Sequence, residues 1–177
     1  MKKATGVVSA RRLIALLAPG SAEAEVSNTQ ATLFAGLGLA SAVAFPPMIP
    51  VGFVREEEAA ARFSALEAGG AAPYVFCSAG LRWEGGGLFL ALESGGVWDS
   101  LRRLAGDCED GPFPVAEGFI LGCWEAAAET RIADLGRAPC IRFSSCSAAL
   151  VTIHGAWDRK NWWRELYFET TLKKPLR

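Results

Sequence analysis

His154 is the only histidine of the 177-residue chain, so the sequence excludes any reaction that needs two histidines. Histidine titrates near neutral pH without help from its surroundings, which makes it the usual general acid or base. His154 follows the apolar run of residues 150–153 and precedes Gly155. One interpretation makes it a lone acid or base. The interpretation that we favour makes it a histidine near the surface at the end of a strand.

Glu117 and Glu125 are carboxylates that could replace a missing histidine. A glutamate in an apolar setting has a raised pKa, and it can then move a proton near neutral pH. Together with His154, either glutamate would give an active enzyme with relocated catalytic groups. We keep this arrangement as one hypothesis.

The five cysteines predict neither a metal centre nor a disulfide framework. They lie apart and form no C-x-x-C pair, whereas zinc requires clustered thiolate and imidazole ligands. We therefore expect no metal and no cofactor. We expect reduced, mostly buried thiols in a cytoplasmic protein. The five are Cys77, Cys108, Cys123, Cys140 and Cys146.

Eighteen basic and nineteen acidic side chains nearly cancel. No overall field attracts nucleic acid or a membrane, so an anion could bind only at a local patch. Arg82, on a predicted strand, is the first candidate for such a patch and Arg142 is the second. For each of them, a solvated surface arginine is the simpler interpretation. Trp124 could stack a base, but packing in the core or rim is the default for a tryptophan at a strand position.

The order of expected elements predicts an α+β protein. Apolar runs and turn residues predict strands at 12–18, 74–83, 88–92, 118–124, 140–144, 148–154 and 162–172. Helical spacing and glycine stops predict helices at 21–38, 55–68, 97–105 and 125–135. Residues 42–54 form an extended segment with three prolines, which restrict it to the edge of a sheet or to a bulge.

Each half of the chain carries one strand-rich group and two helices. We therefore expect one domain over residues 1–177, built of two similar lobes related by a pseudo-twofold axis. Mostly antiparallel sheets would carry helices on the outside and leave a central cleft. The basic residues and the apolar run at 13–18 resemble a signal peptide, but the run is shorter than the usual apolar region, so a first strand is the interpretation that we favour. No stretch reaches the ~18 apolar residues of a membrane span.

Two stretches place an aromatic residue and a proline ahead of a strand: residues 44–51 and residues 113–122. In these stretches, and in the order of elements over residues 13–172, the chain resembles the 2H phosphoesterase superfamily. That superfamily includes 2′-5′ RNA ligase-like proteins and cyclic nucleotide phosphodiesterases. Each of its two lobes contributes a strand with a His-x-Thr/Ser motif. Met48 and Pro50 then occupy the histidine and hydroxyl positions of the first motif, and Gly118 and Ile120 those of the second.

The resemblance implies a mechanism that these four side chains cannot perform. In the superfamily, one histidine accepts a proton from the attacking oxygen, the other protonates the leaving oxygen, and the hydroxyls bind the phosphate. Met48 and Gly118 cannot transfer a proton, and Pro50 and Ile120 lack hydroxyls. General acid–base catalysis contributes about 10²–10⁴-fold per group, so we expect the phosphodiesterase activity to be lost.

The leading hypothesis is a protein that binds RNA or a nucleotide phosphate in its cleft without catalysis. Its candidate ligand-binding residues are Arg82, Arg142, Trp124 and His154. One alternative is the active phosphoesterase with relocated groups. The other is a protein-interaction module that uses an apolar cleft or the tryptophan-rich C-terminal hairpin. We expect a cytoplasmic monomer with no membrane partner.

Overall fold

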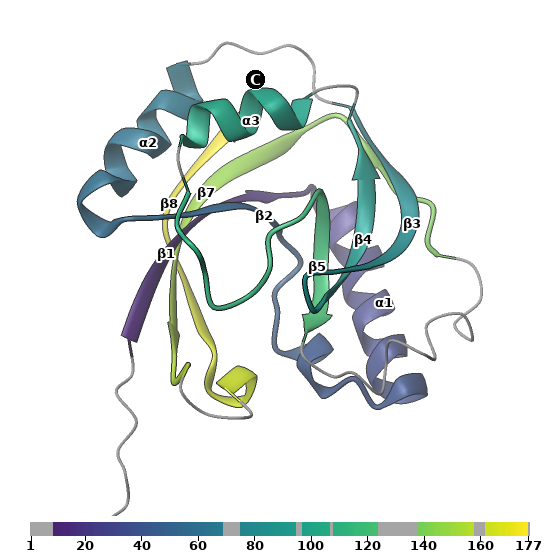
Figure 1. The fold of residues 1–177 in the computed structure, drawn as a ribbon. Helices are drawn as coiled ribbons and strands as arrows, with labels where there is room; N and C mark the ends of the chain where they lie inside the picture. Colours follow the sequence, from purple (N-terminus) through teal and green to yellow (C-terminus); the bar gives the residue numbers. More distant parts are fainter. Residues whose placement is uncertain are drawn as a thin grey trace, which may run out of the picture.

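The protein has an α+β fold of two four-stranded antiparallel sheets and three α-helices within the residues described (Figure 1). The computed structural model describes residues 9–68, 75–94, 97–106, 108–123, 138–157 and 162–176. The α+β class expected from the sequence is therefore confirmed. The expected helix at 125–135 lies outside these residues.

The first sheet has the strand order β2-β1-β7-β8. Its strands are β1 (Ser9–Leu17), β2 (Ile49–Val54), β7 (Cys146–Gly155) and β8 (Tyr167–Leu176). β1 is central and fully buried at Leu13, Ile14, Ala15 and Leu16, because both of its faces are covered. A strand covered on both faces has a continuous apolar run rather than an alternating pattern, as this one does.

The second sheet has the order β5-β4-β3-β6. Its strands are β3 (Phe76–Glu84), β4 (Gly87–Glu93), β5 (Gly118–Cys123) and the short β6 (Arg142–Phe143). Gly85 and Gly86 join β3 to β4 with φ angles of 59° and 85°. Two consecutive residues with positive φ form the tight hairpin turn that suits twisted strands, and glycine adopts that conformation most easily.

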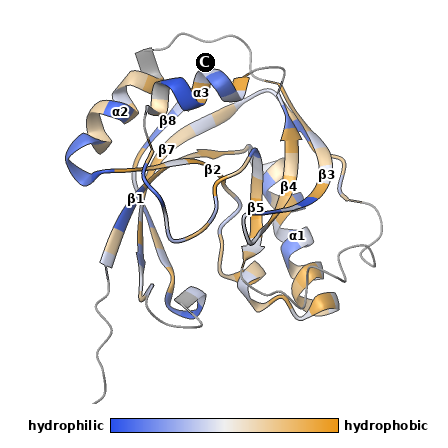
Figure 2. Ribbon diagram, in the orientation of Figure 1, coloured by the Kyte–Doolittle hydropathy of each residue, from blue (hydrophilic) through white to orange (hydrophobic). Residues whose placement is uncertain are grey.

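Three α-helices and two short 3₁₀ segments complete the described chain. They are α1 (Gly20–Leu37), α2 (Glu56–Ala68), α3 (Val97–Ala105), η1 (Ala40–Val43) and η3 (Trp162–Glu165). α1 ends at Gly38, whose left-handed backbone (φ 68°) lets its N–H bond back to the last turn. α2 buries Ala59, Phe63 and Leu66 against the first sheet. In Figure 2, β2 and β4 are coloured hydrophobic, whereas the start of α2 is hydrophilic.

Two apolar clusters form the core, because each strand sends alternate side chains to opposite faces. The helix-side cluster contains Ile14 and Leu16 of the first sheet and Leu88 and Leu90 of the second, together with side chains of the helices. The second cluster joins side chains of both sheets, among them Leu13, Val151 and Ile153 from the first and Phe89 and Ile120 from the second. We call the second one the inter-sheet cluster.

The proline-rich segment behaves as the sequence predicts. β2 lies at the edge of its sheet, and Pro50 opposes Ala15 where the register with β1 shifts. The expected strand at 162–172 is wrong at its beginning, because residues Trp162–Glu165 form a 3₁₀ turn and the strand runs over Tyr167–Leu176. Apolar and aromatic residues predict a strand there, but Trp163 packs into the inter-sheet cluster from the turn.

Candidate functional site

The structure brings the two candidate motifs together. β2 and β5 are the edge strands of their sheets, and the Ile120 N–H donates to the Met48 carbonyl oxygen over 3.3 Å. β5 therefore meets the start of β2. Met48, Pro50, Gly118 and Ile120 all lie at this junction between the sheets.

All four motif positions are buried. Met48 and Ile120 have no exposed surface, and both belong to the inter-sheet cluster. Phe113 lies at the centre of the aromatic part of this cluster. Its ring centroid is 5.1 Å from that of Phe45 and 5.0 Å from that of Phe53, in edge-to-face arrangements. Apolar side chains thus pack around Met48 and Ile120. A pocket of about 280 Å³ borders residues 51–53 of β2, and its wall includes Arg102, Cys108 and Glu109.

Gly118 has no room for any side chain. A Cβ atom at this position would lie 2.3 Å from the carbonyl oxygen of Leu90 and 2.9 Å from its carbonyl carbon. Backbone atoms of the neighbouring strand cannot rotate away as a side chain can. The close approach of β5 to β4 therefore requires glycine here, and it excludes histidine.

Two buried polar side chains hold the junction, and the sequence analysis did not identify them. The Gln30 amide of α1 donates to the carbonyl oxygens of Phe45 (3.0 Å) and Ile120 (3.5 Å). The Ser41 hydroxyl accepts a hydrogen bond from the Cys123 N–H over 3.0 Å. A polar residue on the buried face of a predicted helix is the signal that could have indicated Gln30. These bonds join α1 and η1 to β5, and α1 also to Phe45 in the segment before β2.

Arg82 and Arg142 do not form a common anion site. Arg142 lies on β6 opposite Cys77 of β3, five residues before Arg82 on the same strand. That separation is about 16 Å along a strand. The Arg82 guanidinium pairs with Glu84 over 2.9 Å, and both side chains are exposed. Trp124 lies outside the described residues, as does Glu125.

His154 lies on β7, near the end of that strand and close to the surface, which agrees with the interpretation favoured from the sequence. Its side chain is 34% exposed, and its Nε2 atom lies 3.9 Å from a carboxylate oxygen of Glu169. Its ring centroid is 5.8 Å from that of Tyr167. Glu117, in contrast, pairs with Arg102 of α3 over 3.1 Å. His154 and Glu117 therefore have different partners and do not form the acid–base pair of the relocated-enzyme hypothesis.

Arg12 is the centre of a polar network that the sequence analysis missed. Its guanidinium donates to both carboxylate oxygens of Glu56 and to the hydroxyls of Thr152 and Thr171. The hydrogen bond to Glu56 raises the pKa of Arg12, and the same bond lowers the pKa of the Glu56 carboxyl. The network fastens the first turn of α2 to the first sheet.

This network predicts a small loss of stability in acid. Glu56 has a lowered pKa in the folded protein, so its contribution is complete above its unfolded pKa and disappears as the pH falls through its folded pKa. Because Glu56 is exposed, Glu56→Gln should lower the free energy of unfolding at pH 7 by less than about 1 kcal/mol. Urea unfolding of both proteins from neutral to acidic pH measures the difference. Glu57→Gln, on the same helical turn, is the control. A difference that grows in acid would contradict the assignment.

The expectation of mostly buried cysteines is wrong. Cys123 and Cys146 are buried, Cys77 is intermediate, and Cys108 and Cys140 are exposed. Both exposed cysteines lie in loops, where no core is available to cover them. None of the five forms a disulfide, and burial raises the pKa of Cys146 to about 11. The Cys146 thiol is therefore protonated at neutral pH and is a poor nucleophile.

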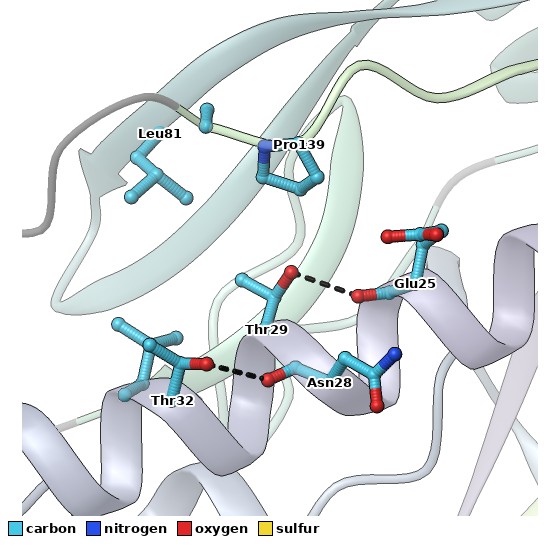
Figure 3. A pocket seen from close by; sticks show the side chains of 8 residues that line it. Glu25, Asn28, Thr29, Thr32, Leu81 and Pro139 are labelled. Carbon is cyan, nitrogen blue, oxygen red and sulfur yellow. Dashed lines mark hydrogen bonds between the residues drawn. The ribbon is translucent and has the colours of Figure 1, made fainter.

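A pocket of about 250 Å³ lies between α1 and β3 (Figure 3). Its wall on α1 includes Glu25, Asn28, Thr29 and Thr32, and Leu81 and Pro139 lie opposite. The two threonine hydroxyls donate to carbonyl oxygens one turn earlier in the helix, over 2.8 and 2.9 Å. The residues that line the pocket include no lysine, arginine or histidine, so the pocket offers no cationic side chain to a phosphate.

In the part of the chain that the structure describes, no three histidine, cysteine, aspartate or glutamate side chains converge as metal ligands would. No helix among the described residues is long and apolar enough to cross a membrane. Comparisons of the chain with protein-family models, with curated proteins and with solved structures found no match.

Proposed function

We propose that this protein is a degenerate relative of the 2H phosphoesterases that has lost catalysis and acts as a protein-interaction module. The connectivity supports the relationship. β1, α1 and β2 follow one another, and so do β4, α3 and β5. In each group the two strands pair directly, and the motif strand is the edge strand of its sheet. This repeated arrangement supports two lobes related by a pseudo-twofold axis.

The packing at the junction supports the loss of catalysis. A hydrolytic site needs a substrate phosphate within hydrogen-bond reach of an acid and a base. At the junction, the corresponding positions are buried in apolar surroundings, and Gly118 leaves no space for a side chain. The central cleft expected from the sequence is, on this proposal, filled by the inter-sheet cluster.

Binding of RNA or of a nucleotide phosphate draws less support from the geometry. Phosphate groups require cationic side chains that are available to them. Five arginines of the described chain already pair with carboxylates: Arg12, Arg55, Arg62, Arg82 and Arg102. A phosphate that bound to any of these five would have to displace a carboxylate, and Arg82 and Arg142 form no common site. We therefore do not adopt nucleotide binding as the function.

The single observation that carries the interaction proposal is the exposure of β8. This strand is at the edge of the first sheet, and eight of its ten residues are exposed. Tyr167 is 61% exposed and Leu172 is 42% exposed, which is unusual for large apolar side chains on a long strand. An edge strand presents a row of unpaired N–H and C=O groups, to which an extended segment of another chain can add.

Affinity capture with a charged edge tests the proposal. The double variant Tyr167→Lys/Leu172→Lys places two cations on β8 at exposed positions, so the fold should be kept. Phe34→Lys/Val43→Lys makes the same chemical change at exposed apolar residues of α1 and η1. We expect the immobilised wild type and the Phe34/Val43 variant to retain a protein that the β8 variant loses by more than about tenfold. Equal retention by all three proteins would contradict the proposal.

A further inference from the structure

β8 contains a bulge that gives the strand an unusual order of side-chain directions. Leu150 of β7 opposes Leu172, whereas the next residue, Val151, opposes Thr170. Thr171 is therefore an extra residue. Its hydroxyl lies 3.0 Å from that of Thr152, so it points to the same face of the sheet as Thr152.

The bulge leaves two neighbouring residues, Thr171 and Leu172, on one face. Residues that oppose each other across an antiparallel pair share a face. The partners on β7 thus divide β8 into two sets. One face, which we call the Arg12 face, carries Tyr167, Glu169, Thr171, Leu172, Lys174 and Leu176. The opposite face carries Phe168, Thr170, Lys173 and Pro175. Read from either end, the order of faces along the ten residues is the same.

This symmetry fits β8 to a second copy of itself. When two copies run antiparallel with Thr171 opposite Leu172, Thr170 opposes Lys173 and Glu169 opposes Lys174. Every pair along the strand then has both members on the same face. A shift by one or two residues places the members of some pairs on opposite faces, and one sheet cannot accommodate that.

The charges agree with the same register. Glu169 and Lys174 are both exposed and on the Arg12 face, and each would lie directly opposite the other residue of the second copy. The twofold axis makes this pair occur twice. Opposite charges at directly opposed positions stabilise a strand pair, and like charges destabilise it. No pair in this register joins two like charges.

We propose that the occupant of the β8 edge is a second copy of this chain, so that two first sheets join into one continuous antiparallel sheet. This inference rests on the proposed interaction function and names its partner. It replaces the monomer expected from the sequence.

A second copy suits this edge better than an unrelated straight strand. Bulges, lysines and prolines on an edge strand oppose pairing with foreign strands. β8 carries a bulge at Thr171, and Lys173, Lys174 and Pro175 follow it. Side chains of a straight strand alternate strictly between the two faces, so beyond the bulge they would oppose β8 side chains on the wrong face. A strand with the same bulge at the same place keeps the members of every pair on one face.

A charge-reversal series measured by sedimentation equilibrium tests the proposal. We expect the wild type to dimerise at high micromolar concentration. Glu169→Lys and Lys174→Glu each place two like-charged pairs across the axis and should weaken the dimer by about tenfold or more. The double variant Glu169→Lys/Lys174→Glu restores opposite charges and should restore the wild-type dissociation constant. Lys173→Glu, which makes the same charge change opposite Thr170, should leave it nearly unchanged.

Circular dichroism of each variant checks that the fold is kept. Lys174→Glu tests the charge pair without removing the Glu169 carboxylate, which lies near His154 of β7. A wild type that stays monomeric would overturn the dimer. A double variant as weak as the single variants would overturn the register. If the wild type is monomeric but the capture experiment still finds a protein lost by the β8 double variant, the interaction function stands and only the choice of partner is wrong.

Discussion

Gly118→His is expected to lower the free energy of unfolding by about 3 kcal/mol or more, although it restores the residue that the resemblance places there. The reason is steric and lies in the backbone. The first side-chain atom would lie 2.3 Å from the Leu90 carbonyl oxygen, far inside van der Waals contact. β5 would have to separate from β4, which would disturb Phe119 and Ile120, both fully buried.

Urea unfolding of Gly118→His and Gly118→Ala measures this effect. Both variants should lose stability, because the Cβ atom itself causes the clash. Gly20→Ala is the matched control: nothing lies within 4 Å of a Cβ at Gly20, which is the first residue of α1. That variant should be neutral or more stable by up to about 1 kcal/mol. A Gly118→His protein as stable as the wild type would show that the junction has room for a catalytic side chain.

Phe113→Ala is expected to lower the free energy of unfolding by about 3–5 kcal/mol. Phe113 is buried and contacts Phe45 and Phe53 edge to face. Removing its ring takes away buried apolar surface and leaves a cavity between the two sheets. A loop residue would ordinarily have little effect, so a large loss would show that Phe113 is part of the inter-sheet core.

Thermal and urea unfolding measure this loss, with two comparisons. Phe113→Leu keeps most of the volume and should cost less than half as much. Phe34→Ala removes a ring from the exposed face of α1 and should change stability by less than about 0.5 kcal/mol. A loss below about 1 kcal/mol for Phe113→Ala would mean that the ring is not packed and that the cleft is open.

The fold was largely predictable because most elements carry strong local signals. The prolines in residues 42–54 allowed only an edge strand or a bulge. Pro50 lies on the edge strand β2, at the place where its register with β1 shifts. The Gly85–Gly86 pair allowed only a tight turn between β3 and β4. η3 was not predictable, since aromatic residues at 162–165 fit a strand and a packed turn equally well by type.

The site was less predictable, because its properties arise from contacts between distant segments. Four substituted motif positions indicate lost chemistry, but the sequence does not say whether the space they leave is open or filled. The answer depends on Phe113, which follows an acidic loop and lies against β2. The bulge at Thr171 and the network around Arg12 likewise depend on how β7 and β8 align.

The filled junction is tested most directly by the methyl signal of Met48. The chain has two methionines, so labelling the methionine methyl groups gives at most two signals, and the one from Met48 reports from the core. During titration with 2′,3′-cyclic nucleotides and with short RNAs to millimolar concentration, the Met48 signal should stay at its starting position. A saturable shift of that signal would contradict the account, because it would place a ligand beside Met48, which is fully buried in the inter-sheet cluster.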